Sequence, residues 1–155
     1  MEHDKVTIRI PPGIPEEMVL RLPGRGNPSP AADGEPGDAY VIIRTETGPD
    51  FTRAGADLWH DLHITVPDAA LDTTAAVPAP DGRQLRVTVP PATQPGAVVT
   101  IAGRGLPRYG GRGRGDLNVR VIVDIPRQLS PQQQHLYEQL RALRQARSQR
   151  ADPAA

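Results

Sequence analysis

The chain has 155 residues, no cysteine and a formal net charge of zero. Fifteen glycines and eighteen prolines make up about a fifth of it, which exceeds average usage but stays below the share typical of disordered chains. These values exclude disulfides, thiolate metal sites, a cysteine nucleophile, and the strong basic field that drives non-specific nucleic-acid binding.

Apolar residues that alternate with polar ones indicate β-strands along most of the chain. Gly, Pro and Asp cluster between these segments, as turns require. The alternating segments cover residues 6–10, 18–22, 39–45, 58–66, 85–89 and 117–123. The densest of them, 39–45, is typical of a strand covered on both faces. The pattern predicts an all-β fold.

The last segment changes period and predicts a helix over about 130–148. Ser130 is a favourable N-cap, Pro131 suits the first helical position, and Gln133 completes a capping box. Three leucines then fall at helical spacing on one face, with a tyrosine beside them: Leu136, Leu140, Leu143 and Tyr137. This apolar stripe predicts packing against the rest of the chain or against a partner subunit.

An internal repeat is the most informative feature of the sequence. Residues 6–26 and 85–105 align without gaps over 21 positions, with six identities and matching apolar alternation. Gly37-Asp38 and the strand after it then correspond to Gly115-Asp116 and the strand after them, because the second loop is one residue shorter. The repeat predicts two copies of one small β-structure.

The two copies differ in what precedes them. Residues 51–83, which contain at least one further strand, lead into the second copy, and nothing comparable leads into the first. We therefore expect two tandem β-sandwiches, one over 51–127 and a partial one over 5–46 that is truncated at its N-terminal side. A truncated sandwich has an open sheet edge.

No catalytic or metal-binding set emerges from the residues. His60, Asp61 and His63 are ordinary ligand types, but on a strand His60 points away from the other two, so we expect solvent-facing polar residues there. The sequence offers no nucleophile–base pair and no phosphate-binding loop. We expect neither an enzyme nor a cofactor.

The glycine-rich segment 103–115 resembles an RNA-binding arginine–glycine tract, although its place between two strands favours a connecting loop. Its arginines are Arg104, Arg108, Arg112 and Arg114.

Several spaced motifs together resemble one family. Val-Pro-Pro-Ala-Thr-Gln-Pro-Gly at 89–96, Gly-Arg-Gly-Leu-Pro at 103–107 and Gly-Arg-Gly-Asp-Leu at 113–117 closely resemble the C-terminal region of DnaJ-type co-chaperones. Ile-Pro-Pro-Gly at 10–13 and Gly-Asp-Ala-Tyr-Val at 37–41 resemble it too. The resemblance covers about residues 5–146.

The resemblance implies binding of unfolded polypeptide, which adds as an extended strand in an apolar groove of the first sandwich. The groove residues implied here are Val6, Ile8, Val41 and Ile43. The resemblance also implies a homodimer formed through the helix over 130–148, and therefore through its apolar stripe.

The chain lacks the His-Pro-Asp triplet of the family's J domain and the cysteines of its zinc module. Any support of a DnaK-type chaperone would then be indirect. No apolar run approaches the roughly 18–20 residues of a membrane span, and the acidic N-terminus resembles no secretory signal, so we expect a cytoplasmic protein. Two alternatives stay open. The chain could be a structural dimerisation module, or a nucleic-acid-binding module that uses the arginines of the 103–115 loop.

Overall fold

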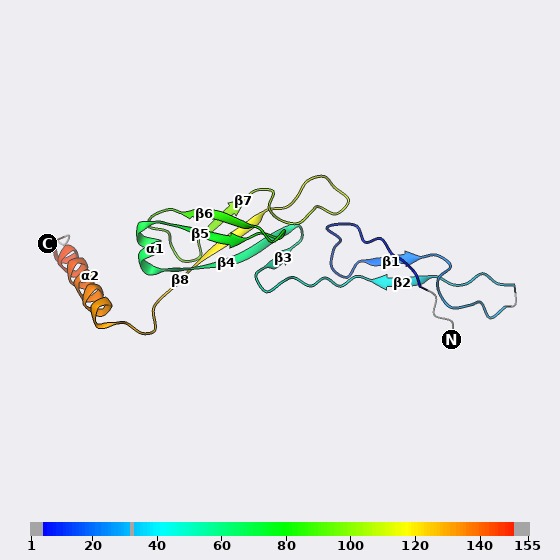
Figure 1. The fold of residues 1–155 in the computed structure, drawn as a ribbon, viewed down its shortest axis with the longest axis horizontal. Coiled ribbons are helices and arrows are strands. Elements are labelled where there is room, and N and C mark those ends of the chain that lie inside the picture. The colour runs from blue at the N-terminus through cyan, green and yellow to red at the C-terminus, as the bar shows by residue number, and fades with distance from the viewer. Residues whose placement is uncertain (1–4, 32, 151–155) are drawn as a thin grey trace, which may run out of the picture. The chain divides into compact units, whose positions relative to one another are not determined.

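The computed structural model describes residues 5–31 and 33–150, and it is mostly β with a C-terminal helix, as predicted (Figure 1). The chain divides into two units, residues 1–123 and 124–155. The strands are β1 Val19–Leu22, β2 Ala39–Ile42, β3 Thr52–Ala54, β4 Asp57–Thr65, β5 Thr73–Pro78, β6 Gln84–Val89, β7 Val98–Ile101 and β8 Leu117–Asp124. The helices are α1 Val66–Leu71 and α2 Pro131–Arg150.

The main core of the first unit lies between two sheets, one of order β3-β4-β8-β7 and one formed by β5 and β6. Alternate residues of β4, β6 and β8 point into it, and Val89, Val119 and Val121 are fully buried. β4 and β8 run in the same direction, because Asp57 lies beside Asp116 and Asp61 beside Arg120. The other pairings are antiparallel.

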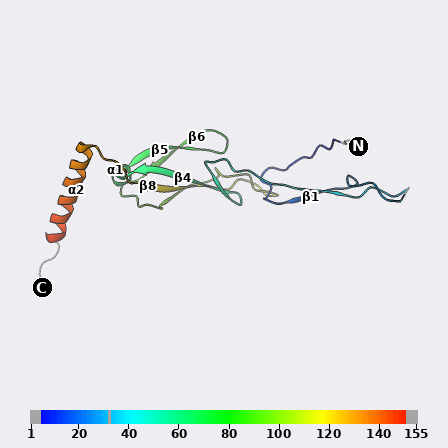
Figure 2. The ribbon, with the colours of Figure 1, turned by 90° about the horizontal axis from the view of Figure 1, so that it is seen from below.

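Helix α1, which the sequence analysis missed, joins β4 to β5 (Figures 1 and 2). Thr65 caps it, since its hydroxyl accepts a hydrogen bond from the Asp68 amide and the Asp68 carboxylate accepts one from the Thr65 amide. Pro67 follows in the first turn, where a missing amide hydrogen costs nothing. Ala69 is the buried residue of the helix.

The internal repeat is visible in the backbone. We call residues 6–43 the first repeat and residues 85–121 the second repeat. β1 pairs with β2 in the same antiparallel register as β7 with β8, so that Val19 faces Ile42 where Val98 faces Arg120. The Gly26 amide bonds the Gly37 carbonyl, and the Gly105 amide bonds the Gly115 carbonyl.

Glycine is required at one position of each repeat. A Cβ on Gly26 would lie 2.5 Å from the Asp38 carbonyl oxygen, and one on Gly105 would lie 2.7 Å from that of Asp116. The strand that returns after each loop therefore passes too close to the first for any side chain.

The strand expected over residues 6–10 is not formed. The equivalent segment of the second repeat is β6, which is held by its pairing with β5. Within residues 5–31 and 33–150, no strand occupies the place of β5 in the first repeat. Apolar alternation alone, without a partner for the backbone hydrogen bonds, leaves this segment outside any sheet.

Helix α2 begins as the sequence predicts. The Gln133 side chain accepts from the Ser130 amide at 2.9 Å, and the Ser130 hydroxyl accepts from the Gln133 amide at 3.2 Å. This is the reciprocal arrangement of a capping box. Among the described residues, no helix has the length and hydropathy needed to cross a membrane.

Candidate functional site

The sheet of the first repeat has an open edge at β2. The Ile43 amide donates to the Met18 carbonyl, so residues 39, 41 and 43 direct their backbone groups at β1. By alternation, the backbone groups of Asp38, Tyr40 and Ile42 point the other way. In the part of the chain that the structure describes, no strand lies on that side. At the equivalent edge of β8 lies β4, and the Leu58 amide donates to the Asp116 carbonyl.

Several positions of the first repeat are more exposed than their buried equivalents in the second repeat. Ile10 is 54% exposed, whereas its equivalent Val89 is 0% exposed. Val41 is half-buried, whereas its equivalent Val119 is fully buried. We call Val6, Ile8, Ile10, Val41 and Ile43 the apolar strip. The equivalents of these residues in the second repeat belong to the core or pack against it.

The four groove residues predicted from the sequence are differently exposed. Val6 is 38% exposed and borders a depression of about 290 Å³ beside Gly24 and Gly26. Ile8 and Val41 are half-buried, and Ile43 is 9% exposed, so Ile43 serves mainly as core. Sequence reasoning missed Ile10 as a surface residue, and the repeat could not reveal it because its equivalent is buried.

The outer face of the β1–β2 sheet is also apolar. Tyr40 is 64% exposed and Ile42 is 60% exposed, so the expectation that this run is covered on both faces is wrong for the described residues. At the two equivalent positions the second repeat has polar residues, Asn118 and Arg120. There the Thr100 hydroxyl donates to the Asn118 side-chain oxygen at 2.8 Å. Arg120 donates from Nε and Nη2 to the two carboxylate oxygens of Asp61.

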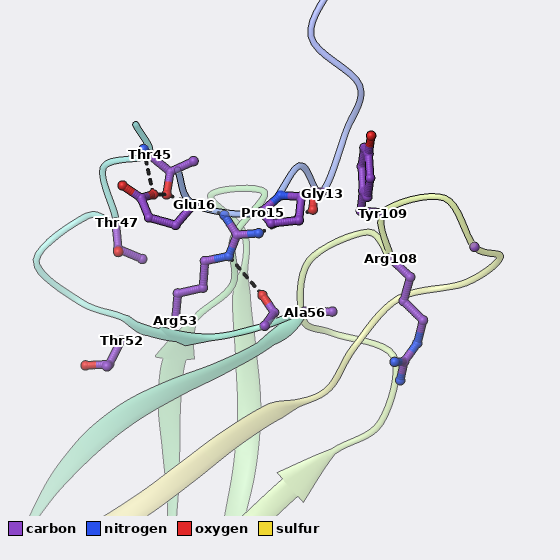
Figure 3. Close-up of a pocket in the computed structure, with 12 residues that line it drawn as sticks. Gly13, Pro15, Glu16, Thr45, Thr47, Thr52, Arg53, Ala56, Arg108 and Tyr109 are labelled. Carbon is purple, nitrogen blue, oxygen red and sulfur yellow. Dashed lines mark hydrogen bonds between the residues drawn. The ribbon is translucent and has the colours of Figure 1, made fainter. Parts of the chain in front are cut away.

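A depression of about 690 Å³ lies where the turn before β1, the segment after β2, β3 and the 103–115 loop meet (Figure 3). Arg53 occupies one wall. Its Nη2 donates to the Gly13 and Ile14 carbonyls at 3.3 and 2.8 Å, and its Nε donates to the Gly55 carbonyl at 2.9 Å. Arg53 is therefore committed to holding the backbone, which favours a structural role over ligand binding.

Two carboxylates stabilise the loops around the first repeat. Hydrogen bonds from the hydroxyl and amide of Thr45 lower the pKa of Glu16, and the positive charge of Arg53 adds to the effect. The Gly24 amide, followed by the Arg21 guanidinium, lowers the pKa of Asp38. Both carboxylates are thus kept ionised to lower pH than usual.

His60, Asp61 and His63 lie on β4, and in the described part of the chain no group of three or more His, Cys, Asp or Glu side chains is placed to hold a metal ion. The Nδ1 atom of His60 lies 2.8 Å from the Asp50 carbonyl oxygen, and its ring packs against that of Phe51. Asp61 is held by Arg120, which lowers the pKa of Asp61.

The 103–115 loop connects β7 to β8, as expected. Arg114 is used internally, since its Nε donates to the Gly105 carbonyl at 3.0 Å.

Helix α2 displays the predicted apolar stripe. Leu136, Leu140 and Leu143 are all more than half exposed, and Tyr137 is half-buried. An exposed leucine stripe of this kind is a typical helix-pairing surface.

Comparison with known proteins identifies the relatives of this chain. The family model described as "DnaJ C terminal domain" matches residues 1–126. Chaperone protein DnaJ 2 of Aquifex aeolicus is 40% identical over 124 residues, which cover 80% of this chain and 33% of that protein.

Two further relatives are similar in extent. Chaperone protein DnaJ of Clostridium beijerinckii is 41% identical over 139 residues, covering 89% of this chain and 36% of its own length. Chaperone protein DnaJ of a Thermotoga species is 41% identical over 134 residues, which cover 86% of this chain and 36% of that protein. The chain thus spans about a third of the length of these curated relatives.

Proposed function

The chain belongs to the DnaJ C-terminal domain family, and on that premise we propose that it binds unfolded or aggregation-prone polypeptides through the apolar strip. The observation that carries the proposal is the exposure of Ile10 and the partial exposure of Val41, at positions whose equivalents, Val89 and Val119, are buried. Exposed apolar side chains can bind the apolar side chains of a non-native polypeptide, and an unpaired strand edge can hydrogen-bond to its backbone.

The proposed mechanism is non-catalytic. Residues 5–46 would act as a partial client-binding sandwich, and residues 51–127 as a complete sandwich that supports it. Apolar side chains of the client would contact Val6, Ile8, Ile10 and Val41, with Ile43 supporting them from the core, and the client's backbone would hydrogen-bond to a strand edge. Main-chain bonds do not depend on the client's sequence, so many clients could bind.

The helix would increase affinity through dimerisation. We propose that two copies of residues 130–148 pair through Leu136, Tyr137, Leu140 and Leu143. A dimer would present two strips to one client, and the second contact would form at high effective concentration. The chaperone role of the relatives further suggests indirect support of a DnaK-type partner, to which the dimer would release its client.

The direct test is suppression of aggregation of a chemically denatured protein by this chain. Val41→Asp should abolish suppression, because it places a charge within the strip. Val98→Asp is the matched control, since Val98 is exposed on the outer face of the second repeat and should tolerate the same change. Fluorescence of Trp59, the single tryptophan, reports whether β4 and the sheet that it shares with β7 and β8 stay folded. Equal suppression by both variants would refute the assignment of the strip.

A further inference from the structure

The 103–115 loop differs in charge from its counterpart in the first repeat. Residues 24–37 contain one arginine and two acidic residues, whereas the 103–115 loop contains four arginines and no acidic residue. Arg114 is used internally, as described above. The other three are exposed and have no ion-pair partner within the described residues: Arg104, Arg108 and Arg112. Three unpaired positive charges therefore lie on one short loop.

The part of the loop over residues 107–114, which we call the arginine hairpin, is held by its own backbone. The Arg108 amide donates to the Gly113 carbonyl at 3.1 Å, and Pro107 and Arg114 form an antiparallel bridge. The hairpin thus presents Arg108 and Arg112 near its tip. A segment that is already ordered loses less conformational entropy when it binds a ligand, which favours binding.

The arginine hairpin contacts the first repeat next to the apolar strip. A Cβ on Gly13 would overlap the Pro107 carbonyl oxygen and lie 3.1 Å from the Tyr109 amide nitrogen, so the two backbones touch here. Ile10 precedes Gly13 by three residues, which limits their separation to about 11 Å. Tyr109 is 40% exposed, and Figure 3 shows its ring beside Gly13. A polypeptide that lies along the strip and continues past Ile10 therefore meets the hairpin.

The depression of about 690 Å³ at this junction has a charged group left for a ligand. Arg108 lines the depression on the side opposite Arg53, and Arg53 is held by backbone carbonyls (Figure 3). The Glu16 carboxylate also lines it, but it accepts from the amide and the hydroxyl of Thr45. Among the described lining residues, Arg108 is thus the charged side chain without a partner, and a guanidinium favours a carboxylate ligand.

We infer that the arginine hairpin selects clients in which an apolar segment is flanked by acidic residues. The apolar segment occupies the strip, and the acidic residues reach Arg108 and Arg112 beyond Tyr109. The inference rests on the proposed function and adds to it the class of client. Exposed charge pairs are weak one by one and are screened by salt. The hairpin therefore sets the preference among clients, whereas the strip supplies the binding that all clients share.

The test compares peptides that share one apolar core and carry aspartates, serines or lysines at both ends. Binding to the full chain is measured by the fluorescence anisotropy of a dye on each peptide. At an ionic strength of about 0.05 M, the aspartate peptide should bind roughly tenfold more tightly than the serine peptide, and the lysine peptide should bind more weakly than either. At about 1 M, where the Debye length falls to about 3 Å, the three affinities should converge.

Two double variants identify the surface that reads the charge. Arg108→Gln with Arg112→Gln should lower the affinity for the aspartate peptide to that for the serine peptide. Arg86→Gln with Arg127→Gln removes the same charge from exposed positions outside the hairpin and should keep the full preference. A preference that survives the first pair, or that the second pair also removes, would overturn the inference.

The outcomes separate this inference from the proposed function. If the serine peptide binds, Val41→Asp abolishes that binding and aspartates add nothing, the inference fails while the proposed function stands. If none of the peptides binds, both fail. If a single-stranded oligonucleotide binds more tightly than the aspartate peptide and the Arg108→Gln, Arg112→Gln variant loses it, the hairpin is a nucleic-acid site and the inference is wrong.

Discussion

The same substitution at equivalent positions of the two repeats should have very different costs. Val89→Asp places a carboxylate where the side chain is 0% exposed, losing about 1.5–3 kcal/mol of apolar burial and at least about 2 kcal/mol more for an unpaired polar group. Ile10→Asp changes a side chain that is 54% exposed. Only about half of the free energy of apolar burial, about 1 kcal/mol, is lost there, and no charge is buried.

Hydrogen exchange reports the two repeats separately. The Ile43 amide, bonded to Met18, and the Val121 amide, bonded to Ala97, are equivalent probes. Ile10→Asp should lower protection of the Ile43 amide by about fivefold, the equivalent of about 1 kcal/mol. Val89→Asp should lower protection of the Val121 amide by about a thousandfold or more, the equivalent of at least about 4 kcal/mol. A comparable loss in both would mean that Ile10 is buried in solution, and the reasoning about the apolar strip would fail.

Three further outcomes are expected. Because the pKa of Asp38 is lowered, its stabilising contribution is complete above the ordinary carboxyl pKa of 3.8 and is lost as the pH falls below that value. Asp38→Asn should therefore make the stability of the first repeat, measured by urea unfolding, less dependent on pH in this acid range. Arg53→Met removes charge-assisted bonds to Gly13, Ile14 and Gly55, and protection of the Ile43 amide should fall about 30-fold, the equivalent of about 2 kcal/mol. Leu140→Asp should give monomers in sedimentation, and an unchanged mass would place any dimer interface elsewhere.

The parts of the fold that follow from local pattern could be predicted from the sequence. The alternation around Leu58 and Leu117 identifies central strands, and Ser130 with Gln133 fixes the start of α2. Helix α1 was missed because its six residues continue an apolar run, although Thr65 and Asp68 already form a capping-box pattern. A short helix of this kind is decided by its cap and by its packing against β4, more than by periodicity.

The exposed part of the site could not be predicted, because exposure depends on neighbours that the local sequence does not contain. Ile10 and Val89 each stand directly before a Pro-Pro pair, at the end of the same apolar alternation. One is exposed and the other buried because β6 has β5 beside it, while residues 6–10 have no strand beside them in the described structure. The repeat predicts where an open edge should lie, and only the structure shows which side chains it uncovers.

The outer face of β2 distinguishes a binding surface from a merely unfinished core. If β2 only lacked neighbours, its outer face would resemble that of β8, where Asn118 and Arg120 are paired with polar partners. Instead Tyr40 and Ile42 are exposed at those two positions. Keeping two large apolar side chains in water favours association over solubility. Apolar residues on both faces of this edge strand therefore support the proposal that non-native polypeptides bind there.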